Sequence, residues 1–283
     1  MSPAETRTGN RGGKDFLYLQ LRELPYFRGL LRAVESRFYQ DYPLAQPVYD
    51  VGCGDGHFAS LTFDRPIDAG LDPWHAPIHE AKGRGAYRIL VEADAARAPF
   101  PDAYFASAFS NSVLEHIPHV QAVLDETARV LKPGALFLFS VPNDNFTRNL
   151  SVARFLDRIG MKRTANGYRR AFNRISRHAH CDPAAAWVDR LKAAGFEIQT
   201  HWSYFSAGAL GALEWGHYLG LPAAVSKKLF GRWILAPWPA NLWLTTSLVR
   251  RYYNEPVPDE LGAYTFYVAR RVPSAKTRQP ADA

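Results

Sequence analysis

The feature that most restricts the fold is a glycine-rich loop, DVGCGDG at residues 50–56, which ends a short apolar run. The apolar run predicts a buried strand, and the segment after the glycines has the pattern of a helix. Glycines between a strand and a helix allow a sharp turn and let the backbone approach a ligand closely. The loop therefore predicts an α/β protein that holds a ligand above its first strand, where a helix N-terminus offers unpaired N–H groups.

Short apolar runs alternate with helical patterns along most of the remaining chain. Later strands are expected at IDAGLD, AYRILVEAD, AYFASAFS, ALFLFSVP and FEIQTH, and at residues 263–272. Helices are expected within 15–41 with a break at Pro25, at 119–131 closed by Lys132-Pro133-Gly134, and after Asp182-Pro183. Strands that alternate with helices predict a parallel, doubly wound sheet.

Residues 15–272 are expected to form a single domain with two long insertions. The ends, 1–14 and 273–283, are poor in apolar residues, so we expect them to be disordered. The expected parts of the domain are a helical cap (15–47), a cofactor-binding core (48–142), a basic insertion (143–181), a helix and strand (182–201), an apolar insertion (202–256) and a last strand (257–272).

Composition excludes several classes of protein. Hydrophobic residues make up 47% of the chain and charged residues 22%, which excludes general disorder. Two cysteines, Cys53 and Cys181, are too few for a disulfide framework or a four-cysteine zinc site. The N-terminal segment lacks the apolar core of a secretory signal, so we expect a cytoplasmic protein.

The basic charge of the chain is concentrated in the first insertion. Lys and Arg number 34 against 27 Asp and Glu, and between Arg148 and Arg177 nine basic residues face one acid, Asp157. Such a patch favours an anionic partner such as lipid headgroups, phosphate or nucleic acid. The alternative is an arginine-rich helix face that is simply solvated.

The second insertion is rich in tryptophan. Residues 202–249 contain five of the seven tryptophans and only four charged residues. The uncharged run 233–249 is short for a membrane-spanning helix and contains two prolines. It is expected either to lie at the inner face of an anionic membrane or to cover the sheet as an apolar lid.

Two acidic residues lie where the next two strands end. Asp72 comes twenty residues after Gly52, where a carboxylate can accept both hydroxyls of a ribose, and Asp94 can accept from an adenine amino group. A dinucleotide fingerprint would need a glycine at His57, which disfavours a nicotinamide-dependent oxidoreductase. These two acids and Asp50, at the start of the glycine loop, each have a structural alternative. Asp50 would cap a turn, Asp72 would pair with a surface arginine, and Asp94 would cap a short helix.

The segments VYDVGCGDGHFA, GLDPW, VEADAARAPFPDAYFASAFSNSVLEHI and VLKPGALFLFSVPN follow one another from residue 48 to 143. In this order they resemble the class I S-adenosylmethionine-dependent methyltransferases. The resemblance implies a Rossmann-like, seven-stranded, mostly parallel sheet in a three-layer α/β/α arrangement, whose last strand is antiparallel. It also implies S-adenosyl-L-methionine as the cofactor.

The resemblance assigns roles to individual residues. The backbone of the loop would pass under the methionyl part of the cofactor at Gly52, Cys53, Gly54 and Gly56. Asp72 would hold the ribose, with Pro73 beside it. The adenine would lie between Asp94 and Ala95. Ser110 would line the floor of the site, and Asp50 would order the glycine loop. Cys53 is expected to be a small packed residue rather than a reactive thiol.

The end of the fourth predicted strand, residues 110–116, is expected to face the transferred methyl group. Its candidate catalytic residues are His116, as a general base, and Asn111. The alternative for His116 is that it only holds the loop. The residues His119, His178 and His180 lack a carboxylate or second cysteine at ligand spacing, so no metal site is expected.

The sequence predicts methyl transfer to a small or lipid-like acceptor at an oxygen atom. A nucleic-acid substrate is not expected, because the Pro-Pro-Tyr or Pro-Pro-Phe motif of DNA and amide N-methyltransferases is absent. One alternative is a non-catalytic protein that binds S-adenosylmethionine or S-adenosylhomocysteine as a membrane-peripheral or scaffold protein. The other is an NAD(P)-dependent oxidoreductase.

Overall fold

The computed structural model describes residues 13–273. The ends expected to be disordered fall almost entirely on 1–12 and 274–283, outside the described residues. The chain divides into two compact units. The sheet unit comprises 44–141, 182–201 and 266–273, and the helical unit comprises 13–43, 142–181 and 202–265.

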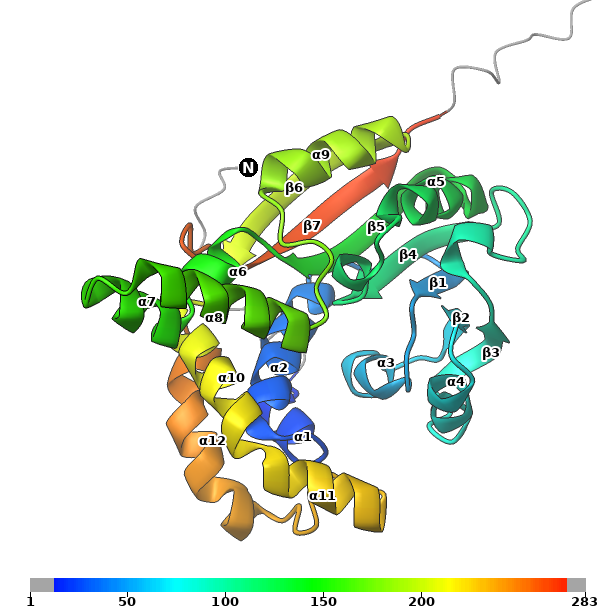
Figure 1. Ribbon diagram of the computed structural model, residues 1–283. Coiled ribbons are helices and arrows are strands. Elements are labelled where there is room, and N and C mark those ends of the chain that lie inside the picture. Colours follow the sequence, from blue (N-terminus) through cyan, green and yellow to red (C-terminus); the bar gives the residue numbers. More distant parts are fainter. Residues whose placement is uncertain (1–12, 274–283) are drawn as a thin grey trace, which may run out of the picture. The chain divides into compact units, whose positions relative to one another are not determined.

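Seven strands form one sheet in the order β3-β2-β1-β4-β5-β7-β6 (Figure 1). The strands are β1 (Val48–Val51), β2 (Ile67–Asp72), β3 (Tyr87–Glu92), β4 (Phe105–Asn111), β5 (Leu131–Pro142), β6 (Phe196–Tyr204) and β7 (Tyr264–Arg271). The pairs β1–β2, β1–β4, β2–β3 and β4–β5 are parallel. The Rossmann-like, mostly parallel sheet predicted from the sequence is therefore confirmed.

The last strand, β7, is antiparallel to its neighbour β6. The Val272 N–H, after β7, donates to the carbonyl of Gly195, which precedes β6, at 3.0 Å. The Ala263 N–H, before β7, donates to the carbonyl of Phe205, which follows β6, at 2.9 Å. The end of one strand thus lies beside the start of the other, so the two are antiparallel.

Helices cover both faces of the sheet unit. On one face, α5 (Val120–Val130) and α9 (Ala184–Ala193) close a core in which the Phe139 ring lies 5.6 Å from Trp187 and 4.7 Å from Tyr267. On the other, Phe63, just after α3 (His57–Thr62), packs against Phe109 of β4 at 4.9 Å. Burial on both faces explains why these strands are nearly continuous in apolar residues.

One boundary differs from the prediction. The segment Lys132-Pro133-Gly134 was expected to close a helix, but α5 already ends at Val130 and the segment belongs to β5. The β4–β5 ladder shifts register here, because Phe105 pairs with Leu131 whereas Ser107 pairs with Leu136. Proline has no N–H for a ladder bond and Gly134 has a φ of +82°, so the extra residues bulge out of the strand.

The helical unit begins with α1 (Phe16–Leu21) and α2 (Tyr26–Gln40), separated at Pro25 as predicted. Glu35 of α2 is fully buried and accepts a hydrogen bond from the Tyr204 hydroxyl at 2.8 Å. The remaining helices are α6 (Asn145–Arg148), α7 (Ser151–Arg158), α8 (Lys162–Ile175), α10 (Ala207–Leu219), α11 (Leu221–Phe230) and α12 (Pro239–Tyr253). Within residues 13–273, none of the helices combines the length and apolarity needed to span a bilayer.

Candidate functional site

The glycine loop turns through backbone conformations that favour glycine. The φ angles of Gly52, Gly54 and Gly56 are +81°, +54° and +70°. A Cβ on Gly52 would lie 2.4 Å from Cγ1 of Val113, so the loop packs directly against the turn that leads from β4 to His116. The Gly52 and Cys53 N–H groups both donate to the Leu71 carbonyl at 2.9 Å, which fixes the loop beside the end of β2.

Gly54 differs from its two neighbours in what surrounds it. A Cβ built on Gly54 would meet no heavy atom within 4 Å, whereas one on Gly56 would lie 3.0 Å from the Tyr87 ring. Glycine at position 54 therefore keeps open a space above the loop, in addition to supplying a left-handed φ. A ligand can approach the backbone at this point.

Asp72 ends β2, and its carboxylate is already tied to the loop. Oδ2 accepts from the Gly54 N–H and Oδ1 from the Trp74 N–H, both at 3.0 Å. Within the described part of the chain it makes no ion pair, so the alternative of a surface arginine partner is not realised. Each oxygen retains a second acceptor position that can serve a ribose hydroxyl. Pro73 and Trp74 follow it, and the Trp74 side chain is 70% exposed.

Asp50 lies in β1, one residue before the strand ends at Val51, and it is buried. It accepts a short hydrogen bond of 2.6 Å from the hydroxyl of Tyr87, on β3. Burial raises the pKa of Asp50 to about 7, against the lowering effect of the Tyr87 hydrogen bond, and the nearby Asp72 charge raises it further. Tyr87 was not identified from the sequence. Its ring also fills the space beside Gly56 and Gly70, so it joins the loop to β2 and β3.

The raised pKa of Asp50 predicts a pH-dependent stability of the ligand-free protein. Folded, Asp50 stays protonated up to about pH 7, whereas in the unfolded chain it ionises near its ordinary value of 3.8. The folded state holds the extra proton, so stability is lost as the pH rises from about 4 to about 7, by up to roughly 1.4 kcal/mol per pH unit. Denaturant unfolding of wild type and Asp50→Asn between pH 5 and 8 tests this. The free energy of unfolding of Asp50→Asn should rise relative to that of the wild type as the pH rises. If the two free energies change in parallel with pH, the raised pKa of Asp50 is contradicted.

Asp94 and Ala95 begin the loop after β3. One Asp94 oxygen accepts from the Ala96 N–H at 2.9 Å and caps the short helix η1 (Ala95–Arg97), which is the structural alternative anticipated for this residue. Its side chain is 56% exposed, and Oδ2 lies 3.8 Å from the Arg97 guanidinium. The cap leaves acceptor capacity for a further donor such as an amino group.

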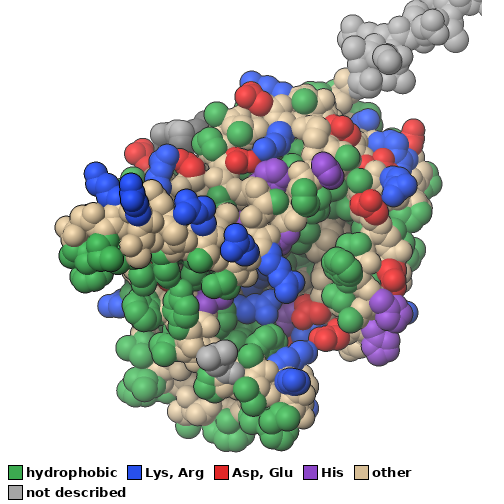
Figure 2. Space-filling model, in the orientation of Figure 1, with side chains coloured by type: hydrophobic (Ala, Val, Ile, Leu, Met, Phe, Trp, Pro, Cys, Tyr) green, Lys and Arg blue, Asp and Glu red, His purple; other side chains and the backbone are tan. Residues whose placement is uncertain are grey.

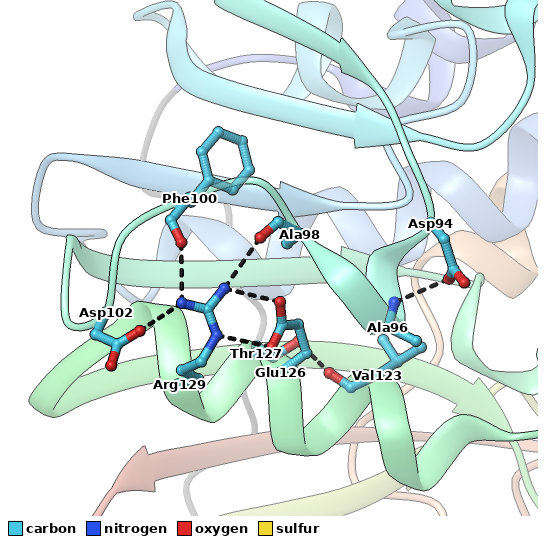
Figure 3. A network of polar contacts seen from close by, with 9 residues as sticks. All are labelled: Asp94, Ala96, Ala98, Phe100, Asp102, Val123, Glu126, Thr127 and Arg129. Carbon is cyan, nitrogen blue, oxygen red and sulfur yellow. Dashed lines mark hydrogen bonds and ion pairs between the residues drawn. The ribbon is translucent and has the colours of Figure 1, made fainter.

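Arg129 of α5 holds this loop in place (Figure 3). Its guanidinium donates to the carbonyls of Ala98 and Phe100, each at 3.0 Å, and to Asp102. Glu126 orients the guanidinium through two hydrogen bonds of 2.7 and 2.8 Å, which also lower the pKa of Glu126. Arg129 therefore positions the segment that carries Asp94. This role of Arg129 is not visible in the sequence, because the arginine lies 29 residues or more from the carbonyls it contacts.

Two small residues of the predicted site, Cys53 and Ser110, are buried and contact other parts of the protein. Burial raises the pKa of the Cys53 thiol strongly, so it stays protonated and acts as a packed residue. Ser110 is fully buried, and its hydroxyl donates to the Val51 carbonyl at 2.8 Å, which ties β4 to β1. The hydroxyl predicted to line the floor of the site thus makes a contact within the sheet.

The end of β4 carries both candidate catalytic residues. Asn111 is buried, and its Oδ1 accepts from the Ser140 hydroxyl at 3.1 Å. Ser112, which follows, has a φ of +51°, a strained conformation for a residue other than glycine. This turn leads into η2 (Leu114–His116).

His116 lies beside a buried carboxylate. Its Nε2 is 3.7 Å from Oε1 of Glu115, whose side chain is 1% exposed, whereas the imidazole is 41% exposed. A carboxylate at this distance favours the imidazolium that forms when histidine accepts a proton. The imidazole is exposed beside a carboxylate, and its role as a general base stays a prediction. Glu115 was not identified from the sequence.

The histidines considered for a metal site belong to different units. His119 precedes α5 in the sheet unit, whereas His178 and His180 lie in the helical unit. The His178 ring packs 4.8 Å from Phe146, and its Nδ1 lies 3.4 Å from the Cys181 sulfur.

Comparisons with known proteins identify similar sequences and a similar fold. Residues 49–139 match a family described as "Methyltransferase domain". Trans-aconitate 2-methyltransferase of Methylobacterium nodulans is 32% identical over 191 residues, covering 63% of this chain and 70% of that protein. A probable S-adenosylmethionine-dependent methyltransferase of Mycolicibacterium smegmatis is 27% identical over 206 residues, covering 72% and 71%.

A solved structure from Thermotoga maritima is similar in fold. It is described as an S-adenosylmethionine-dependent methyltransferase, possibly a histamine N-methyltransferase, and matches with a TM-score of 0.51 at 16% identity. The match covers 90% of this chain and 92% of that one. At this identity the similarity concerns the fold alone.

Proposed function

Because the chain belongs to the class I S-adenosylmethionine-dependent methyltransferases, we propose that it methylates an oxygen atom of a small or lipid-like acceptor. The observation that carries the proposal is the contact between Gly52 and Val113, which joins the glycine loop to the turn bearing Glu115 and His116. This contact supports the proposal that His116, three residues after Val113, acts near the glycine loop. Family membership sets aside the NAD(P)-dependent oxidoreductase and the non-catalytic scaffold as alternatives.

The residues around the loop fit S-adenosylmethionine. The open space at Gly54 admits the methionyl part, and the remaining acceptor positions of Asp72 suit the two ribose hydroxyls. Asp94 is exposed and accepts from an N–H group, as it would from an adenine amino group. The exposed Trp74 indole, two residues after Asp72, offers a surface on which the base can stack.

The reaction needs a positioned acceptor and, for a hydroxyl, removal of a proton. When bound, S-adenosylmethionine supplies a methyl group on a sulfonium, which a nucleophile takes by in-line displacement. His116 accepts the proton of the acceptor hydroxyl, and Glu115 stabilises the resulting imidazolium. Asn111 and Ser110 keep the end of β4 rigid, so that the turn carrying His116 holds its position.

Methylation at oxygen has support from two sides. A relative with 32% identity is named for trans-aconitate, a carboxylic acid, whose carboxylate oxygens are its natural nucleophiles. The Glu115–His116 pair suits a hydroxyl, because a hydroxyl becomes a competent nucleophile only as it loses its proton. A lipid-like acceptor is in keeping with the exposed apolar side chains of the helical unit.

The acceptor can be identified by labelling. A cell extract incubated with the enzyme and methyl-labelled S-adenosylmethionine should yield a labelled product that mass spectrometry detects. If the acceptor is a hydroxyl, the same extract with His116→Asn should yield far less of it. A product formed equally with and without the enzyme would contradict the proposal.

Asp72→Ala is expected to weaken binding of S-adenosylhomocysteine by about 1.5–3 kcal/mol, or ten- to a hundredfold. The substitution removes the ribose acceptor and frees the Gly54 N–H, so the loop also loses its anchor. Titration calorimetry measures the affinity, and Asp189→Ala, an exposed acid on α9, serves as the matched control. Unchanged affinity in a folded Asp72→Ala variant would refute the assignment.

A further inference from the structure

Large apolar side chains are exposed along the second insertion. Leu229 and Trp243 are each 68% exposed, and Phe230 and Leu248 are 62% and 61% exposed. On α12, Leu242, Val249 and Tyr253 are buried. The exposed side chains include the apolar Trp243, Leu244 and Leu248 together with the polar Asn241, Ser247 and Arg251. A helix at a protein–water boundary normally has a polar outward face, so three large exposed apolar side chains among polar ones fit the boundary between water and an apolar phase.

The first insertion combines apolar and basic side chains at the turn between α7 and α8. Phe155, Ile159 and Met161 are exposed there at 59%, 53% and 45%. Four exposed basic residues flank them: Arg154, Arg158, Lys162 and Arg163. Within residues 13–273 these four make no ion pair. Their charges are therefore available to an external anion.

The two insertions are joined through a buried carboxylate. Glu214 of α10 is fully buried and accepts from the Ser151 and Val152 N–H groups at the start of α7, at 2.5 and 3.2 Å. It also accepts from the Tyr168 hydroxyl of α8 at 2.6 Å. The basic α7–α8 turn is thus fixed to the apolar helices. Figure 2 shows Lys and Arg side chains along α7 and α8, with hydrophobic side chains gathered over the region of α10–α12.

We propose that the helical unit binds the surface of an anionic lipid bilayer, with the α7–α8 turn and the exposed apolar side chains of α12 at headgroup depth. Charge complementarity selects this partner. The turn is basic, its apolar side chains are interleaved with the charges, and exposed tryptophans such as Trp238 and Trp243 favour a headgroup interface. A second copy of the chain would bring the same positive charge, because the net charge is +7. The proposal does not depend on the identity of the acceptor.

Vesicle flotation tests the proposal with the full chain. We expect binding to phosphatidylcholine vesicles that contain about one third phosphatidylglycerol, and at least about tenfold weaker binding when salt is raised from about 0.05 to 0.5 M. Vesicles of phosphatidylcholine alone should bind much less. Failure to bind the anionic vesicles at low salt, or equal binding to both kinds, would overturn the proposal.

Two variants separate the basic and apolar contributions. Replacing Arg154, Arg158, Lys162 and Arg163 together by Gln should weaken binding to anionic vesicles by about ten- to a hundredfold. Trp243→Ser with Leu248→Ser should reduce the quenching of tryptophan fluorescence by brominated lipid. Matched controls in the sheet unit are Lys132→Gln with Lys192→Gln for charge, and Ile89→Ser, 55% exposed, for apolarity.

The controls should bind vesicles as the wild type does. If the control variants lose as much vesicle binding as the variants of the helical unit, no specific lipid-binding surface exists there. Sedimentation equilibrium without vesicles tests whether a second copy of the chain covers the apolar face instead of a lipid surface. A dimer that Trp243→Ser with Leu248→Ser abolishes would assign the apolar face to a second copy and overturn the proposal.

Discussion

With a hydroxyl acceptor, turnover should fall by about 10²–10⁴ when His116 is replaced by asparagine, with the affinity for S-adenosylhomocysteine unchanged. The imidazole is the one group of the β4 turn that lies beside a buried carboxylate and still reaches solvent. Asparagine keeps a polar side chain of similar length but cannot accept the acceptor's proton near neutral pH. Initial rates with labelled cofactor, and titration calorimetry, measure the two effects separately.

Glu115→Gln tests whether Glu115 acts through His116. Glutamine preserves the buried shape but removes the charge that stabilises the imidazolium, so we expect a smaller loss and a changed dependence of the rate on pH. His116→Gln serves as a second neutral variant at the base itself. A loss below tenfold in both His116 variants would assign His116 to holding the loop and leave positioning of the acceptor as the main source of rate.

Alanine at Gly52 should mainly lower the stability of the protein, whereas alanine at Gly54 should mainly lower its affinity for the cofactor. At Gly52 the new methyl group would meet Val113 at 2.4 Å in a left-handed backbone, so we expect destabilisation by roughly 2–5 kcal/mol and a displaced His116 turn. At Gly54 the methyl group meets no protein atom, so the cost to folding should stay near 1–2 kcal/mol, roughly that of the φ of +54° alone. Its methyl group would instead occupy the space left for the cofactor.

Urea unfolding and calorimetry with S-adenosylhomocysteine separate these outcomes. Gly54→Ala should lose at least about tenfold in affinity while remaining the more stable of the two variants. Gly134→Ala, where φ is +82° and the space is also open, controls for backbone strain away from the loop. If Gly54→Ala binds as tightly as Gly134→Ala, the space above Gly54 is not the cofactor site.

The sheet and its strand-end acids could be predicted because they follow from local patterns. Buried parallel strands are short apolar runs, and a carboxylate directly after such a run must lie at the carboxyl edge of the sheet. Asp50 and Asp72 were placed at the right strand ends for this reason. The break between α1 and α2 followed from the geometry of proline at residue 25.

Other parts of the site depend on distant partners, which a single sequence does not reveal. The partner of Asp50 is Tyr87, 37 residues away on a strand two positions along the sheet. Arg129 contacts carbonyl groups, which every residue carries, so nothing in the residues it holds indicates the contact. Pro133 and Gly134 are typical of a helix end, and only the pairing of β4 with β5 turns them into a bulge.

We propose that this site transfers a methyl group to oxygen, and the carbon-13 NMR spectrum of the enzymatic product tests this proposal. The product is made from cofactor labelled with carbon-13 in its methyl group, so the new methyl signal reports the atom to which it is bonded. We predict the chemical shift of a methyl ether or a methyl ester. An ether should be almost absent with His116→Asn, whereas an ester can still form, because an ionised carboxylate needs no base. A methyl signal typical of nitrogen or carbon attachment would contradict methylation at oxygen.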